Sequence, residues 1–245
     1  MQKIILLLFL LFICTPVLNA QTVEPSKNIN KNSLQMEFES IFSMEKENIS
    51  ETKSWSTPNL LFRYGFLKNL ELQLSIPIIK ESYYENNEKV YTTHKFDDTQ
   101  FGFSVNLWNQ KKGLPQAALM MRTSFHHQSN LNFSYVGQTF SLNLSNTLTK
   151  NLNLNYNFGY TFEKHSEHTY FIITNLTYNR SSKWSTFLEF SGNTTSDNFL
   201  QNALTGVTKQ FSNSLSFDFS LSKGLNYSQF FIGGRLTWVI IAKNK

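Results

Sequence analysis

A strict alternation of apolar and polar residues constrains the fold of this 245-residue chain more than any other feature. It runs with almost no error through residues 70–78, 101–107, 152–162 and 215–221. Because successive side chains of a strand point to opposite faces, this period of two predicts strands with one apolar and one polar face. Helical spacing is not sustained anywhere after residue 20, so the fold class is predicted to be all-β.

The same pattern predicts twelve strands, joined by connections of two kinds. Short turns at 67–69, 149–151, 179–183 and 210–213 alternate with longer polar connections at 44–56, 81–97, 126–137 and 163–169. Short turns at one end, long loops at the other and an even strand count are typical of outer-membrane barrels. We therefore predict a single antiparallel up-and-down transmembrane β-barrel, with strands at 33–43, 57–66, 70–80, 98–108, 115–125, 138–148, 152–162, 170–178, 184–192, 202–209, 214–222 and 230–241.

The amino-acid composition favours a membrane barrel over a soluble one. The chain contains 23 Phe and 10 Tyr, but only 16% of its residues are charged, against about a quarter in an average soluble protein. A polar face of Asn, Ser, Thr and Gln suits a lumen, and an apolar face rich in Phe and Leu suits lipid. A soluble sandwich or periplasmic barrel, with the apolar face turned inward, stays open as the alternative.

The first twenty residues have the order of a secretory signal peptide. Lys3 precedes an apolar run at 4–13, and Ala20 offers a small residue for cleavage. A lipoprotein signal with Cys14 as the modified residue is the alternative, although bulky residues precede Cys14. Cleavage after Ala20 would remove the only cysteine and leave residues 21–32 as a short periplasmic lead-in before a barrel at 33–245. The formal net charge would fall from +5 to +4, without the basic patch that nucleic-acid binding requires.

Strand parity places several charged residues on the polar, lumen-facing side. Two readings stay open: a constriction that selects solutes by charge and size, or ion pairs that fill a narrow barrel. The candidate lumen-lining residues are Arg63, Glu71, Asp98, Arg122, Glu189, Asp218 and Arg235.

Catalytic and metal-binding chemistry have weak signatures. All five histidines (His94, His126, His127, His165 and His168) fall in the predicted outer loops, and cleavage would leave no cysteine ligand. No serine lies in a G-x-S-x-G setting, and no phosphate loop or dinucleotide fingerprint occurs. We expect no enzyme activity, no catalytic residue, no metal and no cofactor.

Short motifs occur along the middle of the chain. They are Arg63-Tyr64-Gly65, Leu70-Glu71-Leu72, Ile76-Pro77, and Phe96-Asp97-Asp98 before Phe101-Gly102, with Pro115 opening the next strand. These motifs resemble a family of bacterial outer-membrane proteins assigned to the MetA pathway of phenol degradation. The resemblance covers roughly residues 57–240 and departs at 124–130, where the family often has a Pro-Thr-Gly-like turn. It implies an outer-membrane barrel, with passage of small hydrophobic or aromatic compounds.

Three function classes remain after these observations. The first is a channel or transporter for small molecules in the outer membrane of a Gram-negative bacterium. Its partners would be outer-membrane lipid, a small-molecule solute and the barrel-assembly machinery. The second is a structural or docking barrel without transport. The third is a soluble periplasmic protein that binds apolar ligands.

Overall fold

The described residues form thirteen strands that make one continuous sheet. The computed structural model describes residues 23–127, 132–164, 168–195 and 198–241. The predicted signal peptide therefore lies outside the described residues. The strands are β1 (Ser33–Glu47), β2 (Ser50–Leu67), β3 (Leu70–Glu85), β4 (Glu88–Phe96), β5 (Thr99–Trp108), β6 (Gln116–His127), β7 (Phe133–Thr147), β8 (Leu152–Glu163), β9 (Thr169–Asn179), β10 (Trp184–Thr194), β11 (Phe199–Ser212), β12 (Leu215–Gly224) and β13 (Ser228–Ile241).

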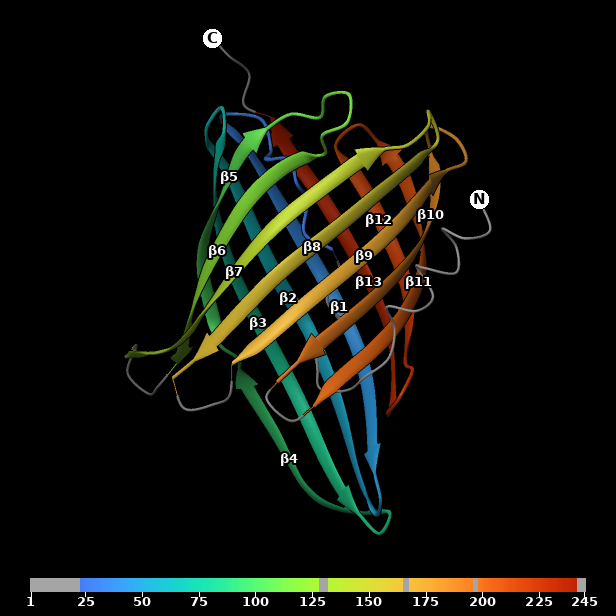
Figure 1. Cartoon of the computed structure of the whole chain (residues 1–245). Coiled ribbons are helices and arrows are strands. Elements are labelled where there is room, and N and C mark those ends of the chain that lie inside the picture. The colour runs from blue at the N-terminus through green and yellow to red at the C-terminus, as the bar shows by residue number, and fades with distance from the viewer. Residues whose placement is uncertain (1–22, 128–131, 165–167, 196–197, 242–245) are drawn as a thin grey trace.

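The sheet closes on itself (Figure 1). β1 pairs with β2 on one side and with β13 on the other, and β2 also pairs with β3. All of these pairings are antiparallel, and with β4 set aside the other strands form a closed barrel of twelve. Closure gives each strand a hydrogen-bonded neighbour on both sides, as backbone in a lipid environment requires. The predicted all-β, twelve-stranded up-and-down barrel is confirmed.

Two of the predicted long loops are extensions of strands. Residues 44–56 continue β1 and β2 into a tight hairpin, where Asn48 has φ of 52°. Residues 81–97 contain the rest of β3 and all of β4, joined by Asn86 and Asn87, which both have positive φ. Two consecutive positive φ values are the signature of a type I′ hairpin turn, and Asn is one of the residues that tolerates it. The prediction missed β4 because these polar hairpins lack the apolar face on which the alternation depends.

The two faces of the barrel differ in chemistry. Large apolar side chains are exposed on the outer face, among them Phe103 on β5, Phe158 on β8 and Leu236 on β13. Buried polar side chains are on the inner face, among them Asn143 and Asn157. An apolar exterior and a polar interior are typical of a barrel that faces lipid on the outside and a lumen on the inside. Among the residues that the structure describes, no helix is long and apolar enough to cross a bilayer.

We predict that the hairpin of β3 and β4 is dispensable for barrel closure. β3 pairs with β5 through Leu70 to Ser75, whereas it pairs with β4 through a separate stretch, Ile78 to Glu85. Replacing residues 81–93 with Asn-Gly should therefore leave the heat-dependent gel mobility of a folded barrel unchanged. Full-length protein is the control, and loss of the mobility shift in the shortened variant alone would show that closure needs this hairpin.

Candidate functional site in the barrel lumen

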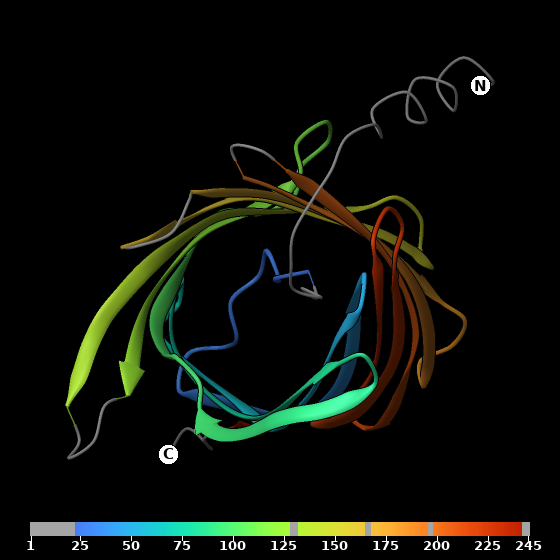
Figure 2. The same cartoon turned by 90° about the horizontal axis from the view of Figure 1, so that it is seen from below.

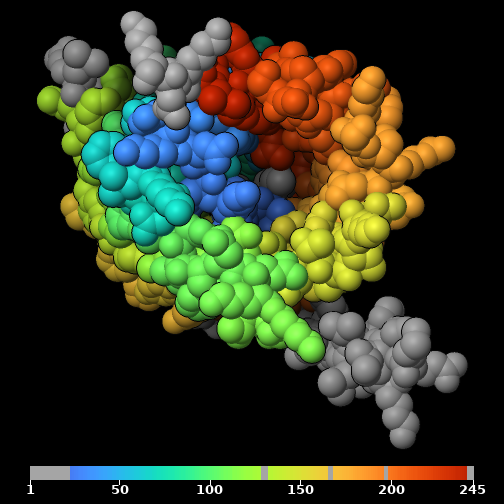
Figure 3. Space-filling model, turned by 90° about the horizontal axis from the view of Figure 1, so that it is seen from above, coloured from blue at the N-terminus to red at the C-terminus, as the bar shows by residue number. Residues whose placement is uncertain are grey.

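The segment before β1 lies inside the barrel. We call residues 23–32 the lead-in. Viewed along the barrel axis, it crosses the lumen next to the inner wall (Figure 2). At the end of the barrel that carries the start of β1, its atoms cover part of the mouth (Figure 3). The sequence predicted a periplasmic position for residues 21–32; the structure places the described part, 23–32, inside the barrel. A polar segment can enter because the inner wall supplies hydrogen-bond partners for its backbone.

Side chains of the wall bind the far end of the lead-in. The amide of Val23 donates to Glu189 Oε2 at 3.0 Å. The amide of Glu24 donates to Asn157 Oδ1 at 2.7 Å, and Asn157 Nδ2 donates to the carbonyl of Glu24 at 3.0 Å. Asn175 Nδ2 also donates to Glu189 Oε2, at 3.0 Å. The wall therefore satisfies backbone groups of a segment that forms no strand of its own.

The other end of the lead-in approaches the wall at Gly65. The amide of Asn32 donates to the carbonyl of Gly65 at 2.7 Å. A Cβ atom on Gly65 would lie 2.1 Å from the carbonyl oxygen of Asn30, a main-chain atom that cannot rotate away. Glycine is required at this position because only it lets two main chains approach so closely.

A network of charged side chains joins the lead-in to β2, β3 and β6. Arg63 Nε lies 2.7 Å from Glu71 Oε1, and the amide of Ile29 donates to Glu71 Oε2 at 2.9 Å. Gln73 donates to Glu71 Oε1 at 2.8 Å and accepts from Arg122 Nε at 2.8 Å. Glu71 is 0% exposed, so its charge is compensated entirely by these partners.

Arg122 completes the connection to the lead-in. A second guanidinium nitrogen of Arg122 lies 2.8 Å from Glu24 Oε1. One side chain of the wall thus holds both the lead-in and the network on β3. This contact explains how a segment without strand pairing keeps a defined position in the lumen.

A second group of charges extends the network to β1, β12 and β13. Arg235 lies 3.2 Å from Asp218 and 3.3 Å from Glu37. Glu37 also lies 3.8 Å from Arg63, which links the two groups. Glu39 accepts a hydrogen bond of 3.1 Å from Asn59. Carboxylates outnumber guanidinium groups in this network, because three arginines face Glu24, Glu37, Glu39, Glu71 and Asp218.

The structure brings six of the seven predicted lumen residues into contact with this network or with the lead-in. Arg63, Glu71, Arg122, Asp218 and Arg235 belong to the network, and Glu189 binds the lead-in. Asp98 does not join them. It lies between β4 and β5 at the rim and contacts His126 Nδ1 at 2.9 Å.

Sequence reasoning missed three carboxylates. Glu37 and Glu39 alternate with Met36 and Phe38, so strand parity could have found them. Glu24 lies outside any strand, and no periodic signal could have placed it.

A tyrosine near the rim is held as a hydrogen-bond donor. Tyr227 lies between β12 and β13, and its hydroxyl lies 2.8 Å from Asn202 Oδ1 and also bonds to Gln229. Burial is the main cause that raises the pKa of Tyr227 to about 12. The hydroxyl therefore remains a donor to a higher pH than that of an exposed tyrosine, and it fixes the turn against β11.

The lumen wall is not polar throughout. Ile173 on β9 is paired in register with Asn157 and Ser191, and Leu204 on β11 is paired with Glu189. Ile173 is 1% exposed. Because residues paired in an antiparallel sheet share a face, these apolar side chains point into the lumen beside the residues that bind the lead-in. Within the part of the chain that the structure describes, the buried apolar residues on either face are Ala117, Ala118, Met120, Phe171, Ile173, Leu200, Leu204 and Phe231.

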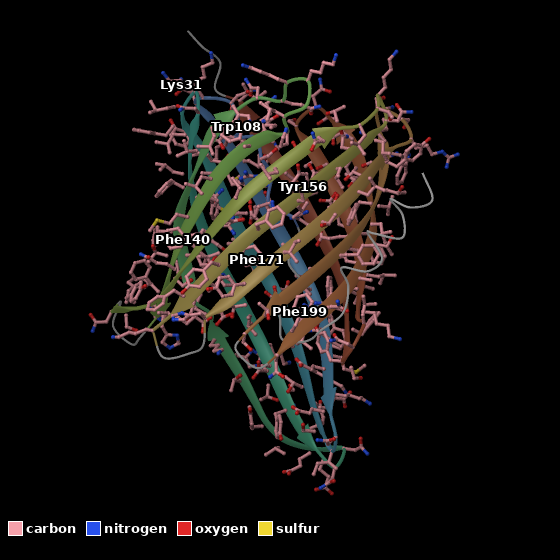
Figure 4. The ribbon with its side chains drawn as sticks, in the orientation of Figure 1. Lys31, Trp108, Phe140, Tyr156, Phe171 and Phe199 are labelled. Carbon is pink, nitrogen blue, oxygen red and sulfur yellow. The ribbon has the colours of Figure 1, made fainter. Side chains whose placement is uncertain are left out.

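Phe171 shows how the wall accommodates a large ring on its inner side. Phe171 is paired in register with Gly159, and a Cβ atom there would lie 1.9 Å from the ring. The ring therefore lies across the glycine. Phe171 on β9 lies at mid-height in the barrel, whereas Lys31 and Trp108 lie at the end that carries the start of β1 (Figure 4). The lumen therefore combines a charged network with an apolar section of wall.

Within the described ranges, no group of three or more His, Cys, Asp or Glu has the arrangement of a metal site.

Comparisons with known proteins identify relatives of this architecture. A family model described as "Putative MetA-pathway of phenol degradation" matches residues 24–238. The crystal structure of the COG4313 outer membrane channel from Pseudomonas putida F1 matches with a TM-score of 0.66 at 12% identity, over 89% of this chain and 100% of that chain. None of the curated proteins compared with the chain matches it.

Two autotransporter domains share the fold. The translocator domain of NalP from Neisseria meningitidis matches with a TM-score of 0.54 at 11% identity, over 88% of this chain and 90% of that chain. The transport unit of AIDA-I from Escherichia coli matches with a TM-score of 0.52 at 12% identity, over 87% and 91%. At these identities the likeness is one of fold alone.

We predict that Gly65→Ala displaces the lead-in. The added Cβ would meet the carbonyl oxygen of Asn30 at 2.1 Å, so the two main chains must separate. Ser26, whose hydroxyl lies 2.6 Å from that of Ser145, is a buried reporter position. In a Ser26→Cys background, Gly65→Ala should raise the rate of labelling by a polar maleimide about tenfold, which corresponds to ~1.4 kcal/mol of opening free energy.

Gly233→Ala is the matched control. Its Cβ would meet Ile41 Cγ1 at 3.3 Å and no atom of the lead-in. Equal labelling rates in the two glycine variants would contradict the role given to the close approach at Gly65.

Proposed function

Because the chain belongs to the family described as "Putative MetA-pathway of phenol degradation", we propose that it is an outer-membrane channel that passes small hydrophobic or aromatic molecules. The observation that carries the proposal is the apolar section of the lumen wall around Phe171, Ile173 and Leu204. Buried Phe, Ile and Leu side chains offer neither a charge nor a hydrogen bond to a hydrated ion. An apolar solute gains free energy from each apolar surface that it covers.

The charged network has a different part in this proposal. Through Glu24 and Ile29, and with Glu189 holding Val23, it keeps the lead-in across the lumen and so limits the free cross-section for hydrated solutes. Phe171, Ile173 and Leu204 are 8%, 1% and 4% exposed, so an apolar solute contacts them only when the side chains packed over them move aside. The channel needs no catalytic residue and no cofactor for this passage. The name of the Pseudomonas putida relative, an outer membrane channel, supports the same class of function.

Alternatives from other classes are less well supported. A soluble periplasmic binder would have to expose the large apolar side chains of the outer face to water, for example Phe103 and Trp238. A docking barrel without transport is favoured by one observation, which is that the lead-in occupies part of the lumen (Figure 2). A transport measurement separates this alternative from the channel.

We predict that the protein speeds entry of a hydrophobic probe through an intact outer membrane. The probe is N-phenyl-1-naphthylamine, which fluoresces when it reaches an apolar phase. Cells producing the protein should take it up faster than cells without it, whereas hydrolysis of a hydrophilic β-lactam in the periplasm should change little. Ile173→Asn should slow probe entry roughly threefold or more, because it replaces an apolar contact by an amide.

Thr177→Asn is the matched control, since it lies on the same side of β9 and is already polar. Both variants must retain heat-dependent gel mobility. Probe entry that is no faster with the folded protein than without it would favour the docking barrel over the channel.

Arg122→Ala should change the ion selectivity of any residual conductance. The substitution removes the guanidinium that contacts Glu24 and Gln73, so carboxylates dominate the lumen further. We expect higher conductance and a reversal potential shifted toward cation selectivity in a planar bilayer under a KCl gradient. Arg180→Ala, at the turn between β9 and β10, is the control. An unchanged reversal potential would remove Arg122 from the ion path.

A further inference from the structure

Four strands continue beyond the barrel at the end opposite the start of β1 (Figure 1). We call this region the outer extension; it comprises residues 43–56 of β1 and β2 and residues 79–96 of β3 and β4. Its strands are paired in register from β1 to β4. Because residues opposite each other in an antiparallel sheet share a face, the register assigns every side chain to the lumen side or the outward side.

The charges of the outer extension are segregated by face. Ser43, Ser54 and Glu81 are paired and continue the lumen side. Met44, Lys53 and Ser82 are paired and continue the outward side. The lumen side carries Glu45, Glu47, Glu81, Glu85 and Glu88 with Lys95, and the outward side carries Lys46, Lys53, Lys80 and Lys89 with Glu51 and His94.

The lysines are available for an external partner. Lys46 and Lys53 share one carboxylate, Glu51, at 3.6 and 3.2 Å, and the Lys46 side chain is still 54% exposed. Lys53 Nζ also lies 4.6 Å from the centre of the Tyr84 ring, which holds it on the outward side. No ion pair joins Lys80 or Lys89 to a carboxylate within the described ranges, and both side chains are exposed.

The lysines begin where the apolar band ends. On β3 the outward residues are Leu70, Leu72, Leu74, Ile76 and Ile78, and the next outward residue is Lys80. Eight residue steps at ~3.3 Å, tilted by ~40°, span about 20 Å, close to the height of the apolar band of such barrels. Trp55 is paired with both Phe42 and Lys80, and its ring lies 5.8 Å from that of Phe42. An aromatic girdle marks the membrane interface, and the lysines lie directly beyond it.

We propose that the outward side of the outer extension binds the phosphate groups of phosphorylated glycolipid in the outer leaflet. Clusters of four or more lysines next to a membrane interface bind anionic lipid headgroups, at about 1 kcal/mol for each cation near the surface. A surface in contact with water alone usually carries lysine and glutamate interspersed, because solubility does not require the two signs of charge to lie on different faces. The lumen side of the same strands carries an excess of glutamate. The sign of the charge therefore depends on the face of the strand and not on the local composition.

The test measures binding of bisphosphorylated lipid A to the folded protein in neutral detergent. Lipid phosphorus that coelutes with the protein is quantified against lipid concentration. The variant K46Q/K80Q/K89Q should lower the apparent affinity about tenfold, while Lys53 is retained because it contacts Glu51 and Tyr84. Binding to the native protein should weaken as NaCl rises, because the contact is exposed to screening. Heat-dependent gel mobility checks that each variant is folded.

Of two controls, one matches the loss of three charges and the other removes a single lysine from the opposite face of the outer extension. K68Q/K111Q/K150Q removes three exposed lysines at the opposite end of the barrel, and Lys95→Gln removes a lysine of β4 on the lumen side. Both should bind lipid A as the native protein does. The proposal fails if the outward variant binds like the native protein, if either control loses as much affinity, or if dephosphorylated lipid A binds equally well.

A further arm identifies the source of the phosphate. Inorganic phosphate at millimolar concentration should displace little lipid A, because it lacks the acyl chains that lie against the apolar band. Complete displacement would mean that the lysines bind free phosphate and would overturn the lipid assignment. These outcomes do not depend on probe entry, so this inference and the proposed function can fail separately.

Discussion

Satisfying backbone hydrogen bonds where water is absent is the constraint on which the rest of this structure depends. Pairing of β1 with β13, from Ser33 with Ile241 to Lys46 with Ser228, closes the sheet and removes its edges from the barrel. Closure creates one face toward lipid and one toward the lumen. The alternation in the sequence is the consequence, because every strand must present apolar residues outward and hydrogen-bonding residues inward. Among the described strands, β4 is paired on a single side, and it extends beyond the barrel.

The interior of the barrel is filled partly by the wall and partly by the lead-in. A barrel of this size is too wide to be filled entirely by wall side chains. The chain fills part of it with the lead-in, and the wall provides buried partners such as Glu71, Asn157 and Glu189. Removing one partner of a buried charge costs more than the pair contributes, so the network around Arg63 and Glu71 is strongly coupled. The position of the lead-in is therefore set by many mutually dependent contacts.

Different parts of the barrel meet different environments, and each has a composition suited to its own. Phe103 and Leu236 face outward at the height of lipid, and Ile173 lies in the lumen wall. Beyond the girdle at Trp55, the outer extension has lysine on its outward side and glutamate on its lumen side. The same period of two thus serves two pairs of environments along β3, which are apolar against polar in the barrel and positive against negative in the outer extension.

The amino-acid sequence by itself determined the strands, their number in the barrel and their two faces, because a local period of two reports directly on which side each residue faces. Parity also identified Arg63, Glu71 and Arg235 as inward, and it could have identified Glu37 and Glu39. Only the tertiary structure decided that the lead-in lies inside the barrel, that Glu24 meets Arg122, and that β4 is a strand. These depend on contacts between residues far apart in the chain, such as Val23 with Glu189, or on hairpins with no apolar face. Neither leaves a periodic trace in the sequence.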